Sequence, residues 1–96
     1  MSATANHTVA KFRLGHIVVA PNALESITQD DILTGISRHQ SGDWGDVTAE
    51  DRRANDLALV QRTRILSVYH AANGTQFWLI TEADRSSSCV LLPEDY

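Results

Sequence analysis

Ninety-six residues, of which 43% are hydrophobic, are enough for one domain with a single modest core. No apolar run approaches the roughly 18–20 residues that a membrane-spanning helix needs. The first residues also lack the pattern of a secretory signal, so we expect a cytoplasmic protein. Eight basic against twelve acidic residues give a net charge of −4, which argues against direct nucleic-acid binding because duplex binding usually needs a basic stripe.

Hydrophobic patterning divides the chain into a short tail and one domain. Residues 1–10 are polar and show no periodicity, which predicts a disordered N-terminus followed by a single domain over 11–96. Residues 12–20 are predicted to form a strand that has Phe12, Leu14, His16 and Val18 on one face. Proline at position 21 is expected to end that strand.

Three capping boxes predict three helices. Each box pairs a capping residue with an acidic residue three positions later: Asn22 with Glu25, Thr28 with Asp31, and Thr48 with Asp51. We expect the first helix to cover 23–27, the second to begin near Gln29 and end at Gly42, and the third to cover 49–61.

Apolar residues at helical spacing give the second and third helices one buried face each. The expected inner face of the second helix is Ile32, Leu33 and Ile36. The expected buried stripe of the third helix is Ala54, Leu57 and Ala58.

After Arg64 the period changes to that of strands. Residues 65–71 and 75–81 are predicted to pair through a two-residue type I′ turn at Asn73-Gly74, which brings Tyr69 next to Trp78. A last strand over 89–92 is closed by a proline. The pattern therefore predicts an α+β fold, a three- to four-stranded antiparallel sheet with about three helices on one face.

Residues 39–59 concentrate acidic side chains between the helical and the strand-rich halves. The spacing of Asp43, Asp46 and Glu50 does not match an EF-hand loop, so we predict that these carboxylates cap the next helix and face water, with no metal site. His39 has two interpretations: a base paired with Asp43 or Asp46, or a histidine that interacts favourably with a helix C-terminus.

Two further residues are candidates for binding. Trp44 lies between Gly42 and Gly45, so it is either an exposed anchor for a partner or a lid that folds back on the core. Arg85 lies in a charged turn, and we expect it to form a salt bridge to the acidic stretch that ties the two halves together. Because the nucleotide-binding, zinc-protease and nucleophile-elbow motifs are all missing, we expect neither catalytic residues nor a cofactor.

Three blocks of the sequence resemble a family of small proteins encoded on plasmids, integrative elements and phages. The blocks are residues 42–46 (GDWGD), residues 81–86 (TEADRS) and residues 91–93 (LLP), and the resemblance extends from about residue 12 to residue 96. Members are commonly labelled plasmid-related proteins, and some are labelled type I restriction-modification subunits. The chain has neither the glycine motif nor the N/D-P-P-Y/F motif of an adenine methyltransferase, so the resemblance implies no methyltransferase activity.

The resemblance implies a binding protein of mobile elements, and the acidic charge gives it a physical basis. The main hypothesis is that the protein binds and modulates a host nucleic-acid-handling protein, for example as an anti-CRISPR or anti-restriction inhibitor whose carboxylates occupy a basic surface that normally holds phosphates. We predict neither direct nucleic-acid nor membrane binding. The predicted partner-binding residues are Asp43, Trp44, Asp46, Glu50, Asp51, Asp56, Glu82, Asp84 and Arg85.

Two alternatives remain open. The first is an accessory domain that self-associates, as a homodimer, through a sheet edge or an exposed Trp44. The second is a small metal- or acid/base-dependent enzyme acting on nucleic acid or nucleotides, which requires a histidine and several carboxylates close together. The residues in question are His39, Asp43, Asp46, Glu82 and Asp84.

Overall fold

The computed structural model of the protein describes residues 10–96, which form a four-stranded sheet with three α-helices and a short C-terminal 3₁₀ helix, η2 (Pro93–Asp95). The predicted α+β class is therefore confirmed. The predicted disorder of residues 1–10 falls almost entirely on residues 1–9, which lie outside the described part of the chain. Within residues 10–96, every helix is too short or too polar to span a bilayer.

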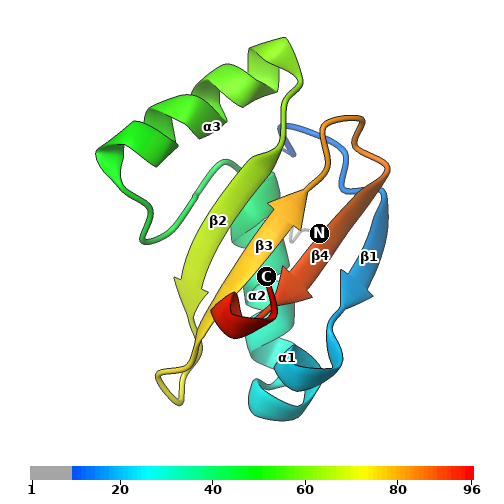
Figure 1. Cartoon of the computed structure of the whole chain (residues 1–96), viewed down its shortest axis with the longest axis vertical. Helices are drawn as coiled ribbons and strands as arrows, with labels where there is room; N and C mark the ends of the chain where they lie inside the picture. The colour runs from blue at the N-terminus through cyan, green and yellow to red at the C-terminus, as the bar shows by residue number, and fades with distance from the viewer. Residues whose placement is uncertain (1–9) are drawn as a thin grey trace, which may run out of the picture.

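The sheet has the strand order β1-β4-β3-β2 (Figure 1). Its strands are β1 (His16–Val19), β2 (Ile65–His70), β3 (Gln76–Thr81) and β4 (Ser87–Leu91). The last three follow one another in an antiparallel meander, as predicted. Neighbouring strands of a meander need only short turns between them, which is why their sequence signals lie close together.

β1 differs from the prediction in direction and in length. It pairs with β4 in parallel, so the sheet is mixed. Parallel neighbours need a crossover connection, and here all three helices and the β2–β3 hairpin lie between the two strands in the chain. The strand is also shorter than residues 12–20, because Gly15 has a left-handed backbone (φ 67°) that interrupts the extended chain.

The helices are α1 (Pro21–Ser26), α2 (Gln29–Gln40) and α3 (Ala49–Gln61). The predicted caps Thr28 and Thr48 are confirmed, since their hydroxyl oxygens accept the N–H groups three residues later. In Figure 1, α2 lies behind the sheet and α3 lies beside β2.

The predicted capping role of Asn22 is wrong. The cap position is Ala20, no side chain caps the helix, and Pro21 occupies the first turn, where its missing N–H costs nothing. The amide of Asn22 instead donates to the carboxylate of Asp95 near the C-terminus, at 2.9 Å.

The β2–β3 hairpin closes with a three-residue loop instead of the predicted two-residue turn. The N–H of Ala71 donates to the carbonyl of Thr75, and the N–H of Gly74 donates to the carbonyl of Ala71. Gly74 has φ 88°, so the loop is a type I turn followed by a left-handed residue. The side chain of Asn73 supports this turn by accepting the N–H of Thr75.

The different loop shifts the strand register by one residue. Tyr69 lies opposite Phe77, and Trp78 lies opposite Val68, so the predicted Tyr69–Trp78 pair is wrong. Because side chains alternate between the two faces of a strand, Tyr69 and Phe77 face α2 together, whereas Trp78 lies on the other face. There it packs against Tyr96, with ring centroids 5.5 Å apart.

Two clusters of buried side chains form the core. The larger cluster joins α1 and α2 to the sheet and includes Ile32, Tyr69 and Phe77. Gly35 lies over the ring of Phe77, and a Cβ atom there would come within 2.9 Å of it, which explains the glycine in this helix. The smaller cluster lies between α3 and β2 and contains Trp44.

Three residues predicted to be buried are exposed instead: Leu33, Ala54 and Leu57. On α3 the buried residues are Ala58, as predicted, and Asn55, whose side chain bonds the main chain of Leu66. Leu33 faces a groove that is described below.

Candidate functional site

Trp44 closes the smaller core cluster and does not face solvent. Its side chain is 1% exposed and lies in a cluster with Ala58 and Ile65, with Phe12 packed against it. The indole N–H donates to the carboxylate of Asp56 at 3.0 Å, which satisfies its only polar group. Of the two interpretations of Trp44, the second is therefore correct: the side chain folds back on the core as a lid and offers no surface to a partner.

The segment that carries Trp44 also occupies the outer edge of β2. The N–H of Val68 donates to the carbonyl of Trp44, and the carbonyl of Val68 accepts the N–H of Asp46. Gly45 lies opposite Val68 with φ 75°, and a Cβ atom there would overlap the Val68 carbonyl. Only glycine allows this close approach of the two backbones.

Asn55 occupies the next position along the same edge. Its side-chain amide donates to the carbonyl of Leu66 at 2.7 Å and accepts the N–H of the same residue at 3.2 Å. A carboxamide can replace a neighbouring strand in this way because it offers one donor and one acceptor side by side. The edge of β2 is thus occupied at Leu66 and Val68, two of the residues whose backbone groups face away from β3.

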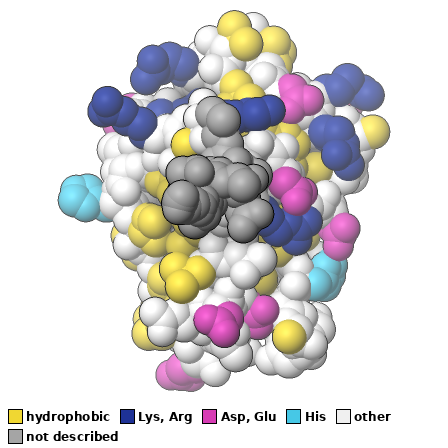
Figure 2. Space-filling view, turned by 180° about the vertical axis from the view of Figure 1, so that it is seen from behind, with side chains coloured by type: hydrophobic (Ala, Val, Ile, Leu, Met, Phe, Trp, Pro, Cys, Tyr) yellow, Lys and Arg dark blue, Asp and Glu magenta, His cyan; other side chains and the backbone are white. Residues whose placement is uncertain are grey.

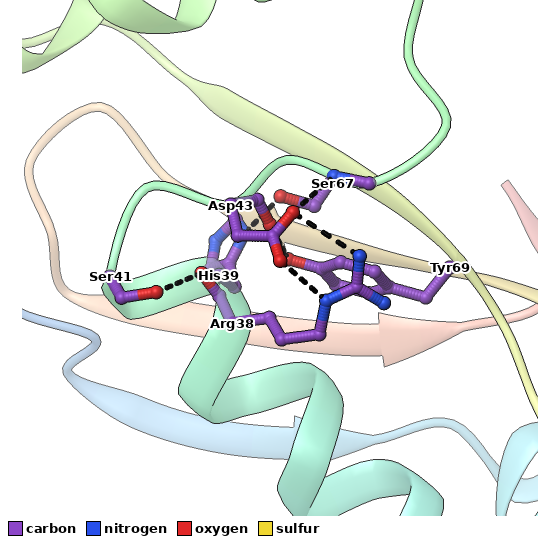
Figure 3. A network of polar contacts seen from close by, with 7 residues as sticks. Arg38, His39, Ser41, Asp43, Ser67 and Tyr69 are labelled. Carbon is purple, nitrogen blue, oxygen red and sulfur yellow. Dashed lines mark hydrogen bonds and ion pairs between the residues drawn. The ribbon is translucent and has the colours of Figure 1, made fainter. Parts of the chain in front are cut away.

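Asp43 is held by Arg38 and Tyr69 (Figure 3). Arg38 Nε donates to the Asp43 carboxylate at 2.7 Å, and its guanidinium lies over the Tyr69 ring, 4.6 Å from the centroid. The hydrogen bond from Arg38 lowers the pKa of Asp43. The Tyr69 hydroxyl donates to the Asp43 main-chain carbonyl. Much of the Asp43 charge is therefore matched within the molecule.

His39 lies at the centre of a buried chain of hydrogen bonds. Its ring nitrogens contact the hydroxyls of Ser67 (Nδ1, 2.6 Å) and Thr81 (Nε2, 2.8 Å). Thr81 contacts the hydroxyl of Ser88 at 2.7 Å, and Ser88 donates to the carbonyl of Leu14. Since each hydroxyl has one proton, Ser88 accepts from Thr81, Thr81 accepts from Nε2–H, and Nδ1 accepts from Ser67.

This network makes His39 a structural residue. Its side chain is 0% exposed, and burial lowers its pKa to about 3. The imidazole is neutral with both nitrogens occupied, so it has neither access to a substrate nor a free position for a proton. The predicted pairing of His39 with Asp43 or Asp46 as a base is therefore wrong.

Arg85 ties the two halves of the chain together through backbone carbonyls instead of the predicted salt bridge. Its side chain is 8% exposed. One guanidinium nitrogen donates to the carbonyl of Ala58 in α3, and the other donates to Thr63, Glu82 and Ala83. The guanidinium thus joins the C-terminal end of α3 to the β3–β4 turn, where a positive charge also suits the helix dipole.

The remaining predicted partner-binding residues are held by separate local contacts. Asp46 lies 2.8 Å from His70, Glu82 lies 3.4 Å from Arg64, and Asp84 accepts the N–H of Ser86. Glu50 and Asp51 lie in the first turn of α3, as expected for capping acids. In the described part of the chain, no three His, Cys, Asp or Glu side chains are grouped so that they could hold a metal ion.

The opposite edge of the sheet, β1, is open. The N–H of His16 donates to the carbonyl of Ser86, directly before β4, and the N–H of Ala20 donates to the carbonyl of Val90 in β4. Because backbone groups alternate in direction along a strand, the N–H and C=O of Ile17 and Val19 point away from the sheet. No residue among 10–96 forms a backbone hydrogen bond with them.

An apolar groove of about 500 Å³ follows this open edge between β1 and the helices α1 and α2. Its walls consist mainly of Ile17, Val19, Leu24, Ile32, Leu33 and Ile36. Leu24 is 64% and Leu33 53% exposed, so the groove accounts for the hydrophobic side chains that the core leaves uncovered on this side. Sequence reasoning missed it, although the i, i+1, i+4 pattern of α2 is wider than one packing contact requires.

Charges on the helical side of the molecule are unevenly distributed. Figure 2 shows hydrophobic side chains gathered on one side of this face, whereas at its lower end the charged side chains are all acidic. The acidic residues at the start of α2 are Asp30 and Asp31, and Glu25 lies in α1. The end of the groove near α1 therefore has a negative potential.

Comparison of the chain with known protein families, with curated proteins and with solved structures finds no match. The resemblance to proteins of plasmids, integrative elements and phages accordingly stays a prediction from the sequence.

Proposed function

We propose that the protein is a binding module that takes up an extended segment of a partner protein along β1, with alternate apolar side chains of that segment in the groove. The observation that carries this proposal is a sheet edge that no other part of residues 10–96 pairs with, directly beside an apolar groove. Addition of a strand to such an edge is a recurrent mode of peptide recognition, in which backbone hydrogen bonds give affinity and pockets give specificity.

The difference between the two sheet edges supports this proposal. On β2 a side-chain amide and a neighbouring loop satisfy the edge groups of Leu66 and Val68, which is how proteins commonly prevent unwanted strand pairing. On β1 no residue among 10–96 pairs with the outward groups of Ile17 and Val19. A partner that pairs with the N–H and C=O groups of Ile17 and Val19 needs an extended backbone, because only then do its own C=O and N–H groups lie opposite them.

The groove specifies the side chains of the partner. Ile17 and Val19 face the helices, since they lie on the same side of the sheet as Val90 in the core. A strand added beside β1 would place every second side chain toward Leu24 and Leu33, so those side chains should be apolar. The acidic residues near α1 favour a basic residue at that end of the bound segment.

The partner class that we predict from the sequence, a host nucleic-acid-handling protein with a basic surface, stays part of this proposal, as does a cytoplasmic location. The binding surface differs from the one expected, because β1 and the groove replace residues 43–56 and Trp44 as its centre.

The experiment is a selection of random peptides displayed on phage against the intact protein, followed by affinity measurements on one synthetic peptide. We expect selected sequences with apolar residues at alternate positions and a basic residue at one end. Val19→Pro should weaken binding at least about tenfold, because proline removes an outward N–H while an edge strand tolerates it. Leu33→Asp should weaken binding by a similar factor.

Leu57→Asp is the matched control, because Leu57 lies on α3 and is exposed to the same extent as Leu33, at 53%. Its affinity should equal that of the wild type. Equal affinity of all three variants would overturn the proposal. A wild-type dimer that becomes monomeric in Val19→Pro, measured by sedimentation, would also overturn it, since the occupant would then be a second copy of the chain.

A further inference from the structure

A second hollow, of about 350 Å³, lies between residues 11–13 and the C-terminal end of α3. Four basic side chains line it: Lys11, Arg13, Arg62 and Arg85. No acidic side chain of residues 10–96 does so, although the chain as a whole has a net charge of −4. This concentration of positive charge is the reverse of what the composition predicts.

The charge of Arg85 has no carboxylate to balance it. All of its hydrogen bonds within residues 10–96 go to main-chain carbonyls, and burial, followed by the positive charge of Arg62, lowers its pKa. A buried guanidinium next to a second arginine attracts an anion. A negative ligand would offset the cost of burying the Arg85 charge and would reduce the repulsion between the two arginines.

Backbone geometry also distinguishes two of these residues. Arg62 and Arg85 have φ values of 59° and 62°, and they are the two non-glycine residues of the described chain in the left-handed region. For Arg62 this conformation ends α3, at a position where helices usually have glycine. Strained backbone of this kind tends to occur where a side chain is needed for binding.

Hydrogen bonds fix the main chain at Lys11, beside the hollow. Its N–H donates to the carbonyl of Gln40 at 2.8 Å, and the side chain of Gln40 donates to the carbonyl of Phe12 at 3.1 Å. The ring of Phe12 lies 5.6 Å from the Arg85 guanidinium and forms part of the apolar wall. The hollow therefore combines one guanidinium held in place by hydrogen bonds, that of Arg85, with exposed basic side chains and an aromatic surface.

We propose that this hollow binds the phosphate group of a small phosphorylated molecule. Guanidinium groups bind phosphate oxygens through two parallel hydrogen bonds, which suits a site with several arginines. The volume exceeds what a phosphate alone requires, so an attached group can lie against Phe12 and the exposed side chain of Val60. The net negative charge disfavours a long polyanion, which would approach acidic surfaces as well.

Calorimetric titration at low ionic strength with pyrophosphate and with AMP tests this proposal. Both should bind, and Arg62→Gln and Lys11→Gln should each weaken binding about five- to tenfold, as expected for loss of a charge-assisted hydrogen bond. Arg53→Gln is the matched control on the same helix, outside the hollow, and should change the affinity less than about twofold.

Arg62→Gly separates a binding role from a structural one. Glycine adopts the left-handed conformation freely, so this variant should melt at a higher temperature than the wild type and still lose phosphate affinity. Absence of binding up to about 10 mM pyrophosphate, where a ligand of even millimolar affinity would be seen, would overturn the proposal. So would equal affinities of Arg62→Gln and Arg53→Gln, or binding of a single-stranded oligonucleotide without binding of AMP.

Discussion

Buried neutral His39 makes the stability of the protein depend on pH in a specific window. In the unfolded chain the imidazole binds a proton below its ordinary pKa of 6.5, whereas in the folded protein burial lowers this pKa to about 3. Between these values only the unfolded state gains the proton. The free energy of unfolding should therefore be highest above pH 6.5 and should fall as the pH falls toward 3.

The size of this effect can be worked out at pH 5. At this pH the protonated form of the unfolded imidazole is about 30 times as abundant as the neutral form. Proton binding therefore stabilises the unfolded state by about 2 kcal/mol relative to pH 8. The exact folded pKa matters little for this figure, because about 3 is already well below pH 5. Carboxylates contribute little in this window, since in the unfolded chain they titrate near pH 4.

Urea unfolding of the wild type and of His39→Gln at pH 8 and pH 5 measures the effect. The variant will be less stable at both values, but it has no imidazole at position 39, so its loss between pH 8 and pH 5 should be smaller than that of the wild type by about 2 kcal/mol. His16→Gln, which alters an exposed histidine of β1, is the matched control for the loss of a histidine. Equal pH dependence of the wild type and His39→Gln would refute the account of a buried neutral histidine.

Three further substitutions test the contacts that hold the candidate site. Arg85→Ala should destabilise the protein by about 3 kcal/mol, because four carbonyls lose a charged donor, and an unchanged melting temperature would show that the guanidinium does not join the two halves. Gly45→Ala should cost at least about 2 kcal/mol in denaturant unfolding, since its backbone is left-handed and the Val68 carbonyl occupies the space of a Cβ atom; wild-type stability would contradict the close approach. Asn55→Ala should lose about 1–3 kcal/mol by the same assay and should speed amide exchange at Leu66, whereas unchanged exchange would mean that the side chain does not occupy this edge.

Local sequence signals predicted most of the fold correctly. The caps at Thr28 and Thr48 depend on contacts three residues apart, so the sequence alone contains the information. The period-two pattern likewise located β2 and β3. The capping box at Asn22 failed because a proline can start a helix without a capping side chain, which left the asparagine free for a distant partner.

Non-local contacts explain the predictions that failed. The parallel pairing of β1 with β4 depends on how the whole chain crosses between them, which no local pattern encodes. Asn55 appeared to be a polar residue on an exposed face, yet it is buried because a strand edge lies opposite it. A one-residue difference in the hairpin loop was enough to exchange the partner of Tyr69.

The candidate site shows the same limit. In the sequence, Leu33 has the spacing of a core residue of its helix. It lines a groove because no other element of residues 10–96 packs over it. Conversely, the acidic residues that appeared to form a binding surface include Asp43 and Asp56, which hold Arg38 and Trp44 in place. Charge and hydrophobicity predicted which side chains matter, but their partners decide whether they bind within the molecule or outside it.

Amide hydrogen exchange at β1 is the most direct test of the proposed binding mode. In the free protein no residue among 10–96 pairs with the outward amides of Ile17 and Val19, whereas the amide of Val18 faces β4 and serves as an internal reference. Addition of a selected peptide should slow exchange at Ile17, Val19 or both by at least about tenfold, because strand addition gives outward N–H groups acceptors. If the peptide binds and neither rate changes, the partner does not add to this edge, and the proposed function is contradicted.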